Sequence, residues 1–131
     1  MIVSSIKTIF QSDIKKVWDT VLSVENYSWR SDLSRTEVLN EKQFIEYTKD
    51  GYTTVFSVTV AEPYKRWEFN MENKNMRGHW VGIFTQKGDK TEVEFTECIT
   101  AKKIFLKPFV KIYLKKQQSR FIEDLKKELL R

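Results

Sequence analysis

Hydrophobic and polar residues alternate over most of the first hundred positions. Residues 2–10 alternate in a segment rich in β-branched side chains, which is typical of a strand. The same period of two returns between Arg35 and Ala101, where turn-forming groups such as Lys49-Asp50-Gly51 and Asn73-Lys74-Asn75 interrupt it. We therefore expect one strand at the start of the chain and six more in an antiparallel meander.

Between the first two strands the spacing changes to that of helices. Ser12 or Asp13 can cap a helix that ends near Ser23, because its apolar residues recur at intervals of three and four: Ile14, Val17, Trp18, Val21 and Leu22. The polar segment 25–32 carries two aromatic rings. We expect a second short helix there, or a loop that the two rings hold in place.

The end of the chain is predicted to be one long helix. Pro108 is acceptable only in a first helical turn, so the regular helix should begin near Lys107. Its apolar residues are spaced by four, seven, four and four positions: Val110, Leu114, Phe121, Leu125 and Leu129. A sheet with one apolar face needs such a helix as cover, which predicts the α+β class.

A cavity should lie between the concave sheet and this helix. Aromatic residues make up 14% of the chain, and rings of that size must line a core or a cavity wall. We expect about 300 to 1,000 Å³, the range common for ligand sites. The predicted walls are the inward-facing strand residues and one helix face: Phe56, Trp67, Phe69, Trp80, Phe84, Phe95, Val110, Leu114, Gln117 and Phe121.

Length and cysteine content exclude several classes of protein. The chain has 131 residues, which suits a single domain over 1–131. Cys98 is the only cysteine and His79 the only histidine, so a disulfide scaffold and a structural zinc site are excluded, and we expect no metal or cofactor. The start has no leader pattern, and no long apolar run occurs, so we expect a cytoplasmic protein.

Several short motifs occur in a recognisable order along the whole chain. They are Val17-Trp18, Tyr27 with Trp29, Asp50-Gly51, Glu62-Pro63, Gly78-His79-Trp80, Thr91-Glu92-Val93, and Leu125 with Glu128. With the order of elements, they make the chain resemble the START-like helix-grip (SRPBCC) superfamily, particularly its polyketide cyclase/dehydrase-like branch. The resemblance implies a seven-stranded curved antiparallel sheet gripping the C-terminal helix, with two short helices between strands one and two and a deep apolar cavity.

The resemblance does not imply one activity. Similar proteins bind sterols, phospholipids, plant hormones or polyketides, and a minority are cyclases, hydratases or chaperone activators. No catalytic motif is shared across the branch, so function must be argued from this chain's own residues.

Two carboxylates are candidates for chemistry in the cavity. Glu97 shares strand parity with Val93 and Phe95 and should face inward, unless the strand ends or bulges before it. Either Glu46 or Tyr47 must also face inward. A buried acid has a raised pKa and could anchor a ligand or act as an acid/base, and Glu46 and Glu97 could share a proton if they were close.

Two other reactive residues give weaker signals. His79 has the parity of the convex face and is expected to be a surface residue. Cys98 is out of phase with the inward set and has no local base, so it could act as a nucleophile only if His79 approached it.

The start of the long helix is basic and apolar on more than one face. No acid occurs from Ile99 to Ile122, and the net charge of the chain is +5. This segment could rest on anionic lipid or a protein partner, or it could be covered by the sheet and the first helix, with its lysines in solvent. From the covered arrangement we expect weak or no membrane binding. Nucleic-acid binding is not expected, because the rings lie on inward parity.

The sequence thus leaves three functions open. The first is binding of a small to medium hydrophobic ligand, such as a lipid or polyketide, with Glu46, Tyr47 or Glu97 as polar anchor. The second is a metal-free cyclase or dehydratase-like enzyme that uses a cavity carboxylate. The third is an interaction module that acts through the basic helix.

Overall fold

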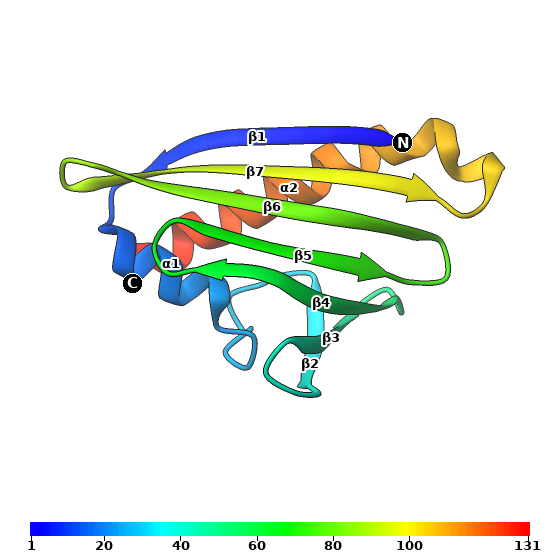
Figure 1. Cartoon of the computed structure of the whole chain (residues 1–131), viewed down its shortest axis with the longest axis horizontal. Coiled ribbons are helices and arrows are strands. Elements are labelled where there is room, and N and C mark those ends of the chain that lie inside the picture. The colour runs from blue at the N-terminus through cyan, green and yellow to red at the C-terminus, as the bar shows by residue number, and fades with distance from the viewer.

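Seven strands form one antiparallel sheet in the computed structural model, which describes residues 1–131. The order across the sheet is β1-β7-β6-β5-β4-β3-β2. Figure 1 shows β1, β7, β6 and β5 side by side. The strands are β1 (Ile2–Phe10), β2 (Leu33–Val38), β3 (Gln43–Thr48), β4 (Thr53–Glu62), β5 (Arg66–Glu72), β6 (Met76–Lys87) and β7 (Lys90–Ala101).

Alternation determines which face of each strand is buried. In β5, Trp67 and Phe69 are buried while Asn70 is exposed.

The β6–β7 hairpin is the longest in the sheet and is closed by Gly88 and Asp89. Gly88 has a φ of 63°, which a tight hairpin turn requires and which glycine adopts without steric cost.

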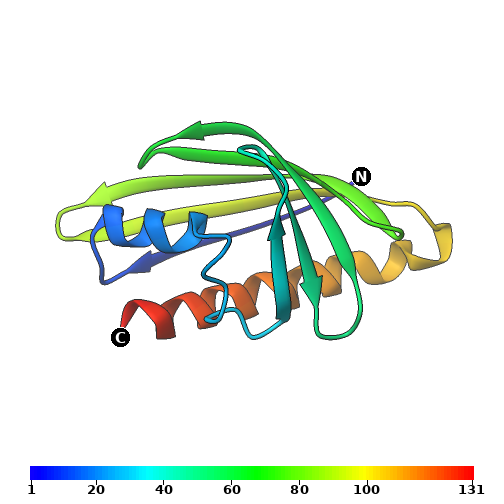
Figure 2. The same cartoon turned by 90° about the horizontal axis from the view of Figure 1, so that it is seen from below.

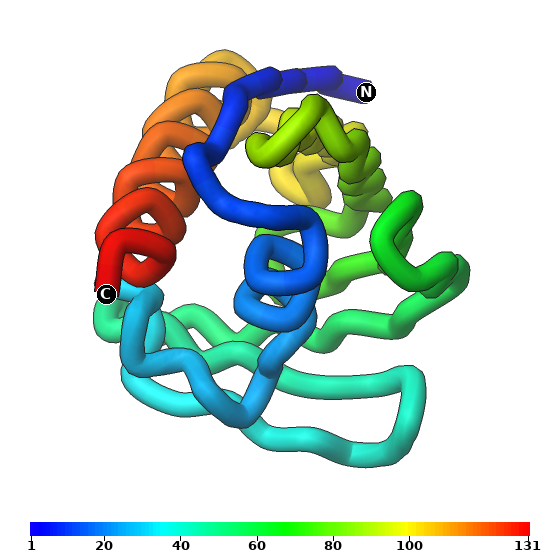
Figure 3. The backbone as a smooth tube through the Cα atoms, turned by 90° about the vertical axis from the view of Figure 1, so that its left-hand side faces the viewer, coloured from blue at the N-terminus to red at the C-terminus, as the bar shows by residue number.

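Two irregularities accompany the curvature of the sheet. The pairing register shifts between Leu33 and Arg35 in β2 and between Val58 and Val60 in β4. Such bulges bend and twist a strand locally. Figure 2 shows the sheet arching over the long helix, and Figure 3 shows the strands curving around both helices.

Two α-helices lie on the concave side. The helix α1 (Ile14–Leu22) is capped by Asp13, which accepts a hydrogen bond from the Lys16 backbone N–H at 2.9 Å. The helix α2 (Lys107–Leu129) begins at the predicted residue and follows a short 3₁₀ turn, η1 (Ile104–Leu106). Neither helix is both long enough and apolar enough to cross a bilayer.

Hydrogen bonds fasten α2 to the edge strand β1. Ser4 donates to the side-chain oxygen of Gln118 at 2.8 Å, and Gln118 donates back to the Ser4 carbonyl at 2.9 Å. Both residues are buried, so the two bonds satisfy polar groups that would otherwise destabilise the core.

The expected second short helix between the first two strands does not form. Residues 23–32 are turns and loop, with one N–H···O bond from Arg30 to Tyr27. The segment lacks a helical apolar stripe, and its polar groups bond elsewhere. The backbone N–H and hydroxyl of Ser31 both donate to Asp124 on α2 at 2.8 Å, which ties the loop to the helix.

Candidate functional site

A cavity of about 160 Å³ lies between the concave sheet and α2. The predicted 300 to 1,000 Å³ was wrong for this structure. The rings that form the wall pack on each other and fill much of the space: Phe69 and Trp80 stack at 4.8 Å between centroids, and Phe44 and Phe56 stack at the same distance. The remaining volume suits a small ligand.

Gly82 allows one of these rings to lie close to the sheet. A Cβ at this position would come within 2.6 Å of the Trp80 indole and 3.2 Å of the Phe95 ring. The two rings are 4.8 Å apart between centroids. The absence of a side chain at Gly82 therefore positions the aromatic wall on which a ligand would lie.

An ion cluster occupies the side of the cavity near the 23–32 loop. The Arg30 guanidinium lies 3.2 Å from Asp32 and 3.3 Å from Glu46, and all three side chains are largely buried. The guanidinium carbon also lies 4.9 Å from the centroid of the Phe121 ring on α2, within the range of a cation–π interaction. Burial raises the pKa of Glu46, and the neighbouring guanidinium opposes that rise.

Glu97 lines the cavity without a protein hydrogen-bond partner. The pairing of β7 continues without a shift through Ala101, so alternation holds at this position, opposite Trp80 on β6 and Ser4 on β1. Burial raises the pKa of Glu97 to about 7, and only the charge of Arg30 lowers it in part. No protein donor hydrogen-bonds to the carboxyl, which is the difference between Glu97 and Glu46. Such a group can donate or accept a hydrogen bond, or a proton, near neutral pH.

Tyr113 and Gln117 bring polar groups from α2 to the cavity. The Gln117 side chain donates to the Tyr113 hydroxyl at 2.9 Å. Burial raises the pKa of the Tyr113 phenol. The cavity thus combines an aromatic wall on the sheet with a polar side on the helix and the loop.

Ten of the predicted site residues line this cavity. They are Phe56, Trp67, Phe69, Trp80, Phe95, Glu46, Glu97, Leu114, Gln117 and Phe121. The structure thus brings Glu46 and Glu97 to the same cavity. Glu46, however, is paired with Arg30, and the proton-sharing arrangement with Glu97 is not formed.

Three predicted residues lie elsewhere. Phe84 packs 4.9 Å from Trp18, because α1 fills that end of the concave face. Tyr47 faces away from the cavity, and its hydroxyl donates to Glu37 at 3.0 Å. Val110 is buried in a smaller cluster with Ile99 and Leu114, beside the cavity.

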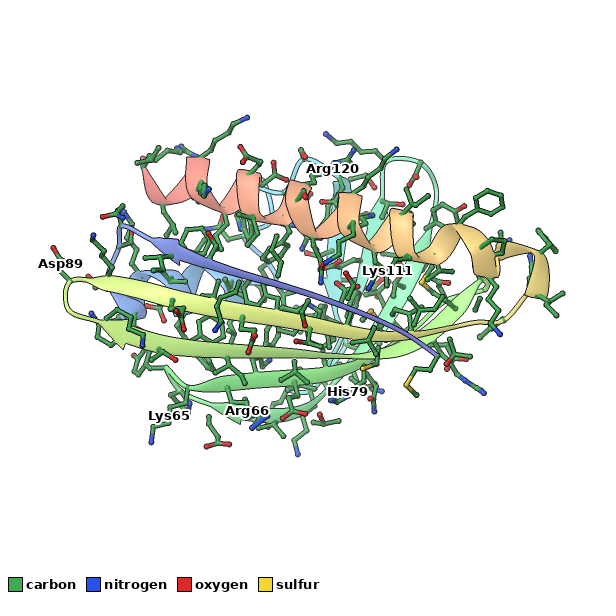
Figure 4. All side chains as sticks on the ribbon, turned by 90° about the horizontal axis from the view of Figure 1, so that it is seen from above. Lys65, Arg66, His79, Asp89, Lys111 and Arg120 are labelled. Carbon is green, nitrogen blue, oxygen red and sulfur yellow. The ribbon has the colours of Figure 1, made fainter.

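His79 and Cys98 occupy directly paired positions on the convex side of the sheet. Both ring nitrogens of His79 are engaged, one by Asn70 at 2.6 Å and the other by Glu68 at 2.8 Å. The imidazole is therefore not available as a base for Cys98. Figure 4 shows His79 on the face turned away from α2. No group of three or more His, Cys, Asp or Glu side chains is placed to hold a metal ion.

Sequence reasoning missed Arg30 and Asp32, and it did not assign Tyr113 to the cavity. Arg30 and Asp32 belong to the 23–32 loop, whose path is decided by its bonds to α2 and not by a local pattern. The sequence contains one signal for this cluster: a cation, Arg30, and an acid, Asp32, stand two positions apart next to the ring of Trp29. Tyr113 lines the cavity from α2, although its side chain is also partly exposed to solvent.

Comparison with solved structures identifies this architecture. A START superfamily protein from Mycobacterium smegmatis superposes with a TM-score of 0.89, at 11% sequence identity, over 97% of this chain and 96% of the other. The chain has the START-like helix-grip fold. This confirms the architecture that the order of motifs predicted, with the one helix fewer described above.

Two further solved structures are similar to this chain. A conserved protein from Geobacillus kaustophilus gives a TM-score of 0.85 at 14% identity, covering 98% of this chain and 95% of the other. DynU16, a protein from the dynemicin biosynthetic locus, gives 0.75 at 15% identity, covering 97% of this chain and 46% of the other. No protein-family model matches the sequence, and no match was found among curated proteins. The likeness is therefore one of fold.

Proposed function

We propose that this protein binds a small, mainly apolar molecule in its cavity and anchors one polar group of that molecule at Glu97. The observation that supports this proposal best is a carboxyl without a protein hydrogen-bond partner, placed beside stacked rings. Ligand sites typically combine an apolar wall with a few convergent polar groups. Burying a carboxyl that has no hydrogen-bond partner destabilises the fold, and Glu97 is partly buried, so a ligand that bonds to it gives a reason for its presence.

Binding is favoured over catalysis because Glu97 stands alone. Acid/base reactions commonly use a second group to complete the proton transfer. The other carboxylate predicted for this role, Glu46, lies 3.3 Å from Arg30 and so already has an ion-pair partner. The enzymatic reading would instead need Glu97 to act as both acid and base.

Native mass spectrometry and a titration with a neutral probe test this proposal. The protein, purified from its host under mild conditions, should carry a small molecule that is released on denaturation. Benzyl alcohol, a ring with one hydroxyl, should bind to the emptied protein, as measured by calorimetry. Gln117→Trp should abolish both signals, because its side chain lines the cavity and the larger ring would fill it.

Ser119→Trp provides a matched control on the same helix, since Ser119 is exposed. If neither a retained molecule nor benzyl alcohol binding is observed, or if Gln117→Trp binds as well as the control, the cavity is not a ligand site.

A second candidate function is docking on an anionic membrane. The residues Ile104, Phe105, Phe109 and Ile112, here called the apolar tip, are 85%, 67%, 64% and 60% exposed. The expectation that the grip covers both apolar faces of this helix is wrong at its start. Figures 1 and 2 show the reason: η1 and the first turns of α2 extend past the end of the sheet.

The charge around the apolar tip favours anionic lipid as the partner. Lys103, Lys107 and Lys116 are exposed, and no acid occurs between Ile99 and Ile122. Apolar side chains that insert at the interface, flanked by lysines that contact headgroups, are typical of peripheral membrane segments. Tyr113 follows Ile112 of the apolar tip and also lines the cavity, so this surface lies beside the cavity lining.

Co-sedimentation with vesicles tests this candidate. The protein should bind vesicles that contain phosphatidylglycerol but not vesicles of pure phosphatidylcholine. Binding should weaken as the ionic strength is raised from about 0.01 M to about 1 M, because the Debye length then falls from about 30 Å to about 3 Å. Replacing Phe105 and Phe109 by Ala should abolish binding. The exposed pair Val38 and Leu39, replaced by Ala, should leave it unchanged. Equal binding to both vesicle types, or none to either, rejects the candidate.

A further inference from the structure

More acidic than basic side chains line the cavity. Arg30 is the one cationic side chain, whereas Asp32, Glu46, Glu72 and Glu97 are acidic. Glu72 is neutralised from outside by Lys102 at 2.6 Å. Arg30 is left to compensate three carboxylates, and it contacts only two of them.

This imbalance determines which ligand charge the cavity can accept. An anionic ligand would face an excess of carboxylates, and the only guanidinium is already engaged by Asp32 and Glu46. A cationic ligand would compensate the one carboxyl that has no partner. A charge-assisted bond of this kind is stronger than a neutral one.

The aromatic rings beside Glu97 also favour a positively charged ligand group. Trp80 is its direct neighbour on β6, and direct neighbours in antiparallel strands have their Cβ atoms about 4.5–5.5 Å apart. Phe69 and Phe95 pack on Trp80 at 4.8 Å between centroids. The faces of aromatic rings attract cations, so an ammonium group at Glu97 would be favoured by those ring faces of this cluster that border the cavity.

The geometry points to a small apolar amine as the ligand of this cavity, bound with its ammonium group at Glu97 and its apolar body against Trp80 and Phe69. This inference rests on the proposed binding function and adds the ligand's charge to it. The volume of about 160 Å³ limits the amine to a compact one, since it lies below the range of about 300 to 1,000 Å³ that is common for ligand sites.

Three probes of nearly equal size separate this inference from the proposed function. Benzylamine, benzyl alcohol and benzoate carry the same ring with a positive, a neutral and a negative group near neutral pH. By calorimetry, benzylamine should bind at least about tenfold more tightly than benzyl alcohol, which corresponds to about 1.4 kcal/mol. Benzoate should not bind.

Variants on β7 show whether Glu97 is responsible for the preference. Glu97→Gln should remove the preference and bring benzylamine to the affinity of benzyl alcohol or below it. Glu94→Gln removes the same charge from the same strand outside the cavity, and it should keep the preference. If benzyl alcohol binds as tightly as benzylamine, the amine inference is overturned and the binding function stands. If none of the three probes binds, both are overturned.

Discussion

Arg30 on the 23–32 loop and Glu46 on β3 form a largely buried ion pair, with Nη1 and Oε2 3.3 Å apart. The same guanidinium holds Asp32 at 3.2 Å. Through these contacts the loop forms one side of the cavity. Glu46 is engaged by the guanidinium and is therefore not free to act as an acid, a base or a ligand anchor. The pair therefore explains why only Glu97 is left free.

Replacing Arg30 with Met should destabilise the protein by about 3 kcal/mol or more at neutral pH, because two buried carboxylates lose their counter-charge. The loss should shrink in acid, because burial raises the pKa of Glu46 and, once the opposing guanidinium is gone, this carboxyl takes up a proton more readily. Urea denaturation at two pH values measures this. As a control, Arg35→Met removes a pair that lies at 3.8 Å and is about half exposed, and it should change stability little. Equal losses for the two variants would contradict the prediction.

Glu97→Gln should stabilise the protein at neutral and alkaline pH. The pKa of Glu97 is raised to about 7 in the folded state. The stability that this group contributes is therefore fully present below its unfolded pKa of about 4.3 and is lost as pH rises through 7. The gain of the variant over wild type should grow across this window, and about 4 kcal/mol is its upper bound, since Glu97 is only partly buried.

Chemical denaturation of the Glu97→Gln variant and wild type at intervals from about pH 4 to pH 8 measures this dependence. Glu94→Gln on the same strand is the control and should show no such gain. A constant difference between variant and wild type across the range would mean that Glu97 is not buried in its charged form.

Gly82→Ala should destabilise the protein by about 1–3 kcal/mol, because overpacking forces rings out of their rotamers. The new methyl would meet the Trp80 ring at 2.6 Å and 2.7 Å. If this clash is the cause, Trp80→Phe should remove most of the added cost. A double-mutant cycle, measured by thermal or chemical denaturation, gives the coupling. Strict additivity of the two substitutions would refute this account of the glycine.

Phe84→Ala should have the full cost of a packed core ring, about 3–5 kcal/mol. Its side chain is 3% exposed and lies against Trp18 and Phe95 outside the cavity, so no empty space is available to soften the loss. Phe105→Ala, at 67% exposure, is the matched ring and should cost little. A small effect of Phe84→Ala on the denaturation midpoint would show that this end of the core is loosely packed.

Local pattern alone determined the elements of this protein. The period of two in the strands and the spacing of Val110, Leu114 and Phe121 in the last helix are properties of the sequence, because side chains must alternate along a strand and recur on one face of a helix. The same rule oriented Glu97 correctly, since β7 has no bulge before it. It could not choose between Glu46 and Tyr47, as a period of two does not say which set of residues faces inward.

Only the tertiary structure decided the cavity and its polar side. The volume depends on how rings from different strands stack, as Phe69 and Trp80 do, and no local pattern encodes that packing. The position of Arg30 depends on Ser31 bonding to Asp124, a contact across 93 positions of the chain. The exposure of Phe105 and Phe109 depends on where the sheet ends. Each of these features arises between segments distant in sequence, where the free energy is set by packing and charge compensation rather than by periodicity.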